Sequence, residues 1–176
     1  MILGLDISTS ITGATILDDD GTIVKNVAWD MRNKNNFKDL FDKAECVRLE
    51  LFKLASYHKI KKIYIEQSLQ SFRSGFSSAQ TLSTLAKFNG IVSWICYKNF
   101  AIKPDYVAAI SARKLVGISV PRGSKAKECV IKYIIDNVPD VSITYTKHGN
   151  VKPDCYDKAD SWVVARAGYL QCSKQN

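Results

Sequence analysis

The sequence predicts an α/β fold in which helices flank a mixed five-stranded sheet. Three short apolar runs near the amino terminus are joined by links too short for a crossover, so they form antiparallel neighbours. Further along, apolar residues recur at intervals of three and four, and these helical segments alternate with two more short apolar runs. Such alternation makes the later strands parallel and places helices on both faces of the sheet.

The pattern also predicts where each element lies along the chain. Strands are expected at residues 2–7, 11–17, 22–29, 63–65 and 106–110. Helices are expected at residues 37–54 and 78–97, in two shorter stretches capped by Ser111 and Ser124, and at residues 157–170. No internal repeat or linker interrupts this order, so residues 1–176 are expected to form one domain.

Composition narrows the functional classes. The 176 residues include 25 Lys and Arg against 17 Asp and Glu, a net charge of +8, and 46% are hydrophobic. A basic globular protein favours a polyanionic partner, nucleic acid first and an anionic membrane surface second. The first residues carry no basic region, and no apolar run approaches the ~18 residues of a spanning helix. We therefore expect a soluble intracellular protein.

The cysteines and histidines do not form a recognisable site. The five cysteines are odd in number, widely scattered and without a CxxC pair, which argues against disulfides and zinc. We interpret them as packing residues of a protein in a reducing compartment. His58 and His148 are isolated and lack the spacing of metal ligands, so we treat both as structural.

Two acids occupy positions where a buried strand should be apolar. Asp6 lies within the first apolar run, and Glu66 ends the run that begins at Ile63. Asp6 alone would fit a turn stabilised by the hydroxyls that follow it, and Glu66 alone would fit a salt bridge. A buried carboxylate without a partner is costly, so each acid needs a partner or a cation.

A second pair of acids opens the last predicted helix. Asp157 and Asp160 are three residues apart and share one helix face. Acids in a first turn also complement the helix dipole, as Asp154 does. The apolar stretch 162–165 would press this helix on the sheet and direct its two acids toward Asp6 and Glu66. Four converging carboxylates suit Mg²⁺ or Mn²⁺, and two such ions can flank a phosphodiester. The sequence therefore favours a nuclease.

These motifs resemble the RuvC family of Holliday junction resolvases, which have a ribonuclease H-like fold. The resemblance rests on Ile2–Gly13, on Ile65-Glu66-Gln67 and on Asp157-Lys-Ala-Asp160, and it spans nearly the whole chain. It implies that Asp6, Glu66, Asp157 and Asp160 are catalytic and ligate two Mg²⁺ ions, with Mn²⁺ able to substitute. It also places Lys125 near the scissile phosphate as a further catalytic residue.

The resemblance implies partners and a location as well. The family acts as a homodimer that nicks opposed strands of a four-way junction symmetrically and leaves 5′-phosphates, and the helix over 78–97 would form much of the dimer contact. The resemblance implies neither a nucleotide cofactor nor a membrane. The expected location is the cytoplasm of a bacterium or of a phage-infected cell.

The DNA contacts are expected from basic and aromatic residues: Phe72, Arg73, Phe76, Arg122, Lys125 and Lys127. Phe72 and Phe76 lie in the loop after Glu66, where aromatic rings can stack on bases; ordinary packing is the alternative. In the family an aromatic comes directly after the catalytic Glu, whereas here Phe72 lies further along. Ser-Thr-Ser after Asp6 replaces the usual Pro-Gly turn, which fits a viral or phage relative.

Two other functions remain open on the sequence alone. Gly4–Gly13 also resembles the phosphate-binding strand–turn–strand of actin-like and sugar-kinase phosphotransferases, although those proteins need two such domains. A non-catalytic protein that binds branched DNA is the third candidate. The four acids argue against it, because a pure binder gains nothing from repelling phosphates.

Overall fold

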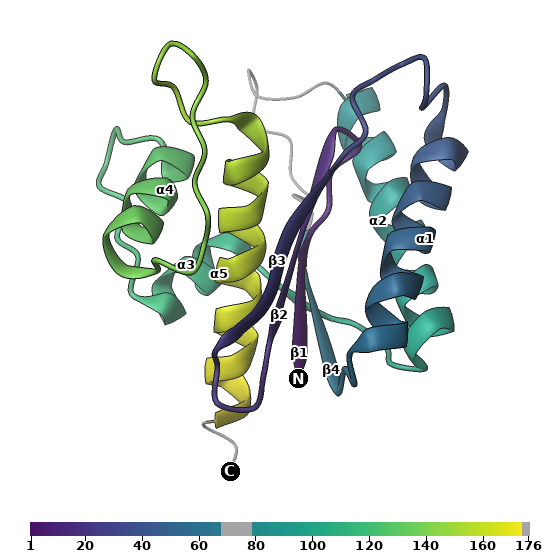
Figure 1. The fold of residues 1–176 in the computed structure, drawn as a ribbon, viewed down its shortest axis with the longest axis horizontal. Helices are drawn as coiled ribbons and strands as arrows, with labels where there is room; N and C mark the ends of the chain where they lie inside the picture. The colour runs from purple at the N-terminus through teal and green to yellow at the C-terminus, as the bar shows by residue number, and fades with distance from the viewer. Residues whose placement is uncertain (68–78, 174–176) are drawn as a thin grey trace.

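The computed structural model describes residues 1–67 and 79–173, which are arranged in three layers (Figure 1). The central layer is one sheet in the order β3-β2-β1-β4-β5. Antiparallel pairs join β1 (Ile2–Asp6), β2 (Ile11–Leu17) and β3 (Ile23–Asp30), while β4 (Lys62–Glu66) runs parallel to both β1 and β5 (Asp105–Val107). The predicted mixed sheet, with three antiparallel strands followed by two parallel ones, is confirmed.

Five helices in the described residues cover the two faces of the sheet. α1 (Leu40–Tyr57) and α2 (Ala79–Phe100) lie on one face, and α5 (Pro153–Ser173) lies along the other (Figure 1). α3 (Ala109–Val116) and α4 (Ala126–Asn137) pack against α5. Within these residues, no helix combines the length and the apolar character needed to cross a membrane.

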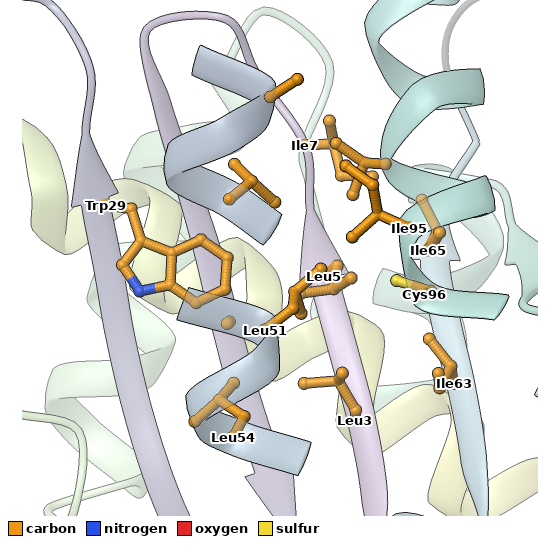
Figure 2. Packing of buried hydrophobic residues seen from close by; sticks show 14 of the residues in the cluster. Leu3, Leu5, Ile7, Trp29, Leu51, Leu54, Ile63, Ile65, Ile95 and Cys96 are labelled. Atoms are coloured by element: carbon orange, nitrogen blue, oxygen red, sulfur yellow. The ribbon is translucent and has the colours of Figure 1, made fainter. Parts of the chain in front are cut away.

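The face toward α1 and α2 is a continuous apolar core. Leu3 and Leu5 of β1 lie beside Ile63 and Ile65 of β4, and Leu51 of α1 packs against them (Figure 2). All five side chains are essentially inaccessible to solvent. Burial of an aliphatic side chain of this size stabilises the fold by about 1.5–3 kcal/mol, so this layer supplies much of the folding energy.

On the other face of the sheet, the backbone of α5 lies close to the backbone of the strands. A Cβ at Gly4 of β1 would overlap the backbone of Ala165, and one at Gly13 of β2 would overlap the Asp157 carbonyl. Glycine at these two positions therefore allows the α5 backbone to lie directly on the strands. The close approach fixes where the first turns of α5 sit.

Buried hydroxyl and amide groups also hold α5 in register. The hydroxyls of Thr15 and Ser161 are 2.8 Å apart, and the Asn26 side-chain amide donates to Thr15 Oγ1 at 2.7 Å. The same amide donates to the Lys158 carbonyl at 3.0 Å, to which Ser161 Oγ also donates. β2, β3 and α5 therefore share one polar network.

The predicted helix starts differ from the structure by one to four residues. The first helix begins at Leu40, capped by Asp39, rather than at residue 37. Ser111 lies inside α3, which is preceded by Ala108 without a side-chain cap. Lys125, rather than Ser124, precedes α4. α5 already begins at Pro153, because proline is well suited to the first position of a helix, where no N–H donor is required.

Candidate active site

The topology brings the four predicted acids to one end of the sheet. Asp6 ends β1 and Glu66 ends β4, and these two strands are parallel neighbours, so they finish at the same end of the sheet. α5 begins at this edge, in the upper part of Figure 1, and runs back along the sheet. Asp157 and Asp160 lie in its first turns, as the sequence predicted for that helix face.

Local packing sets Asp157 beside Asp6. Gly13 is the register partner of Asp6 in the antiparallel pair, and the Asp157 carbonyl rests on Gly13. One turn further along α5, Ser161 contacts Thr15 of the same strand. The position of the helix acids is thus determined by two contacts to β2.

The acids perturb one another's protonation. Burial raises the pKa of Asp6 well above its usual value, and the charges of Glu66, Asp160 and Asp157 raise it further. Burial, followed by the charge of Asp160, raises the pKa of Glu66 to about 7. Burial raises the pKa of Asp157 to about 6 and also raises that of Asp160. These shifts show that the four carboxyl groups form one electrostatic unit.

Three cationic side chains oppose this negative charge. Lys127 Nζ lies 3.8 Å from Asp160 Oδ2, and it lowers the pKa of all four acids. Burial disfavours the charged form of Lys127, but the nearby acids outweigh burial and raise its pKa. Arg113 acts on Glu66 and Asp160, and Arg32 acts on Asp157. The acid cluster is therefore flanked by positive charge.

The donor chemistry fits a divalent cation. All four side chains offer carboxylate oxygens, the ligands that Mg²⁺ and Mn²⁺ prefer. Their pKa values are raised chiefly by burial, and repulsion from neighbouring acids adds to this at Asp6, Glu66 and Asp157. Within residues 1–67 and 79–173, however, no group of three or more His, Cys, Asp and Glu side chains is arranged to hold a metal ion. The four carboxyl groups therefore have the chemistry that such an ion prefers, but in this structure they are not spaced so that they could share one.

The structure separates the predicted DNA-contact residues. Lys127 reaches the acids although its side chain is 63% exposed, whereas Lys125 is 80% exposed and its Nζ pairs with Glu128 Oε1 at 3.1 Å. Arg122 is exposed in the turn between α3 and α4. Phe72, Arg73 and Phe76 lie outside the described residues.

Other residues of the site were missed by the sequence analysis. Neither Arg113 nor Arg32 was among the predicted DNA contacts. Arg32 follows β3 at the edge where β1 ends, because Asp30 of β3 pairs with Ile11 just after the β1–β2 turn. That register could have suggested Arg32. Nothing in the sequence pattern marks the contact of Thr15 with Ser161.

Comparison with solved structures identifies the fold. RuvC of Thermus thermophilus in complex with a Holliday junction substrate matches with a TM-score of 0.68 at 8% identity, over 98% of this chain and 94% of that one. A second structure of Thermus thermophilus RuvC matches at 0.63 and 12%, over 99% and 96%. Ydc2, the yeast mitochondrial Holliday junction resolvase, matches at 0.60 and 15%, over 99% and 81%.

The chain has the RuvC-like, ribonuclease H-like fold. The match extends over nearly its full length, so the predicted fold class is confirmed. No protein-family model matches the sequence, and neither does any curated protein. At identities of 8–15% the likeness concerns the fold, and function has to be argued from the site.

Proposed function

We propose that this chain is a metal-dependent endonuclease that cuts branched DNA, with four-way junctions as its principal substrate. The observation that carries the proposal is the meeting of four carboxyl groups from β1, β4 and α5 in one electrostatic unit flanked by Lys127, Arg113 and Arg32. The fold likeness to RuvC bound to a Holliday junction supports the choice of substrate.

The proposal assigns a role to each group. Asp6, Glu66, Asp157 and Asp160 would hold Mg²⁺ or Mn²⁺, which when bound activates water and stabilises the leaving oxygen of a phosphodiester. Lys127 offsets the negative charge of the acids and so lowers the repulsion that a DNA phosphate meets. Lys125 and Arg122, which are exposed and precede α4, would contact phosphates further from the cut.

We also propose that two copies of the chain act together, with α2 at their contact. Trp94 is 62% exposed on α2, and it lines an apolar surface pocket with Phe41, Ile91 and Gly90. A dimer would cover these side chains and present two acid clusters to two strands of a junction. Sedimentation of the wild-type chain should give twice the monomer mass, and Trp94→Ala should shift it toward the monomer.

A cleavage assay tests the nuclease activity directly. Wild-type protein, Asp6→Asn and Asp136→Asn are incubated with end-labelled four-way junctions, flaps and duplexes in Mg²⁺, Mn²⁺ or EDTA. Asp136 is an exposed acid on α4, so its variant controls for the loss of one negative charge. We expect symmetric nicks with 5′-phosphates from the wild type and from Asp136→Asn, and none from Asp6→Asn or in EDTA.

The same assay separates the alternatives. Cutting by Asp6→Asn at the wild-type rate would contradict the assigned acids. Junction binding without cutting in any metal would favour a non-catalytic DNA-binding protein. The described residues build one sheet, whereas the actin-like and sugar-kinase phosphotransferases need two such domains; tight ATP binding would nevertheless revive that candidate.

A further inference from the structure

A surface pocket lies on the β3 side of the acid cluster. It has a volume of about 390 Å³, and Asp157 forms part of its wall. Ser8 and Ser10 of the β1–β2 turn, Arg32 after β3, Lys127 of α4 and Tyr156 of α5 contribute polar or charged side chains. Four separate chain segments therefore converge on a hollow that borders one of the proposed catalytic acids.

The hydrogen bonds around this pocket fix its rim. Met31 N–H donates to the Ser10 carbonyl at 2.8 Å, which ties the β1–β2 turn to the residue before Arg32. The turn is closed by Thr12, whose hydroxyl donates to the Ser8 carbonyl at 2.9 Å, and Lys43 Nζ holds the Thr9 carbonyl at 2.6 Å. The rim is therefore set by the fold in the absence of a ligand.

The donors that face the pocket remain available. Arg32 donates through Nε and Nη2 to Asp30 at 2.9 and 2.6 Å, which leaves Nη1 uncommitted. In the described part of the chain, the hydroxyls of Ser10 and Tyr156 have no hydrogen-bond partner. Arg32 and Lys127 together outweigh Asp157 in the pocket lining, so its formal charge is positive. Positive charge with free N–H and O–H donors is the chemistry that recognises phosphate.

A second basic pocket lies at α3 and the turn that follows it. It has a volume of about 610 Å³ and is lined by Arg113 and Lys114 of α3, next to Gly117 and Ile118. Arg113 acts on Glu66 and Asp160, whereas Arg32 acts on Asp157, so the two arginines oppose different acids of the cluster. Arg32 follows β3 and α3 follows β5, and these strands are the two edges of the sheet.

We propose that the pocket at Arg32 binds a backbone phosphate of the cut DNA strand several nucleotides from the phosphodiester held at the acids. This inference rests on the proposed function for its ligand. The strand would cross the ends of all five β-strands, from α3 to Arg32. Asp6 ends β1 and Glu66 ends β4, so these acids lie two and three strand spacings from β3. At about 4.8 Å each, these spacings amount to about 10–14 Å, or roughly three to four nucleotides at 3.4 Å each.

Charge-removal variants test whether Arg32 contacts a phosphate. Arg32→Gln is compared with Arg48→Gln, because Arg48 forms the same two-bond pair with Glu45 and is similarly exposed, 44% against 50%. Affinity for a four-way junction is measured in EDTA at several salt concentrations. Arg32→Gln should weaken binding about tenfold and reduce the salt slope by about 0.7–0.9, and Arg48→Gln should change neither.

A substitution of the acid that pairs with Arg32 distinguishes a phosphate contact from a purely structural effect. Asp30→Asn releases the Arg32 guanidinium from its ion pair, so it should tighten junction binding, whereas a merely structural pair would weaken it or leave it unchanged. Inorganic phosphate is tested separately by its effect on thermal unfolding. One combination of results would overturn the proposal: millimolar phosphate protects the wild type from thermal unfolding, but Arg32→Gln and Arg48→Gln bind DNA equally well.

Neutral methylphosphonates locate the contact along the strand. Replacing one phosphate at a time should identify a position, within about four nucleotides of the cut, where the wild type loses affinity and Arg32→Gln loses none. Equal losses for both proteins at every position would overturn the inference while leaving cleavage intact. If such a position is found but the wild type cuts no DNA, the result would support the phosphate pocket and contradict the nuclease proposal.

Discussion

The two faces of the sheet are covered by helices in different ways. Toward α1 and α2, large buried aliphatic and aromatic side chains such as Leu51 and Phe88 form one apolar cluster. Toward α5, Gly4 and Gly13 let the helix backbone rest on the strands, and hydroxyls form part of the contact. The face toward α1 and α2 mainly buries apolar side chains, and the face toward α5 mainly determines where that helix lies.

This difference explains where the acids are found. Asp157 and Asp160 are carried by the helix whose placement is fixed by backbone contact and hydrogen bonds, both of which are short-range and directional. Packed aliphatic side chains tolerate repacking at similar volume, whereas a hydroxyl pair fixes one register. The substitutions below should therefore separate stability from cleavage, each on its own face.

The largest effect on stability is expected on the apolar face. Leu51→Ala removes a fully buried side chain of α1 and should lower the free energy of unfolding by about 2–5 kcal/mol. The acids lie on the other side of the sheet, so cleavage by the folded molecules should stay at the wild-type rate. Urea unfolding and single-turnover cleavage measure the two quantities. A loss of cleavage beyond the unfolded fraction would contradict the division between the faces.

The acid cluster should itself destabilise the fold at neutral pH. The folded state raises the pKa of Asp157 from 3.8 to about 6, so it binds more protons than the unfolded chain between these pH values. Stability therefore falls as pH rises through this window, and at pH 7 the cost is on the order of 3 kcal/mol. Asp157→Asn should recover much of this cost at pH 7 and none at pH 3.

Thermal unfolding in EDTA across pH 3–8 checks this expectation. Asp136→Asn serves as the control, because that side chain is exposed on α4. Addition of Mg²⁺ should stabilise the wild type more than Asp157→Asn if the cluster binds the ion. An equal Mg²⁺ response in both proteins would argue against Asp157 as a ligand.

Gly13 should reveal how precisely α5 must be placed. In Gly13→Ala the new methyl group overlaps the Asp157 carbonyl, so α5 has to shift, at a cost of about 1–3 kcal/mol. Cleavage should fall by a larger factor than stability predicts, since Asp157 and Asp160 move with the helix. Gly90→Ala is the control for stability alone, because Gly90 lines the pocket of the proposed dimer contact: its Cβ meets nothing within 4 Å, and it should stabilise α2 by about 0.5–1 kcal/mol.

The smallest effect is expected for the polar network beneath α5. Thr15→Val keeps the shape of the side chain but removes the hydrogen bonds with Ser161 and Asn26, at a cost of about 1–2 kcal/mol. Ser161→Ala should add little to this cost because the two hydroxyls act as a pair. A double-mutant cycle in urea measures their coupling, and fully additive effects would show that the pair is independent.

The sequence was sufficient to predict the order of the elements and the meeting of four acids, whose catalytic role stays a prediction. Periodicity is a local property, and carboxylates such as Asp6 and Glu66 stand out because they interrupt apolar strands. Helix starts were harder, since Ser111 and Ser124 have good capping chemistry but do not lie at the starts of α3 and α4. β5 ends at Val107 rather than at the expected residue 110, so α3 begins before Ser111. Where the strand ends is a tertiary effect.

The surroundings of the acids could not be predicted in the same way. Lys125 and Lys127 are equivalent in a list of basic residues, and only the placement of α4 brings Lys127 to Asp160. Arg32 gains its significance from a strand register, and Thr15 from a helix far away in the chain. Such pairings depend on the assembled fold, which local pattern does not encode.

The contact between Thr15 and Ser161 joins residues 146 positions apart, and this separation has a consequence for synthesis. At about 5–20 residues per second, a ribosome makes β2 roughly 7–30 s before it makes this part of α5. Until then the nascent chain carries Asp6 and Glu66 without Asp157 and Asp160. If the chain is the nuclease proposed above, translation itself delays its activity, and a truncated product that ends before α5 is harmless to DNA.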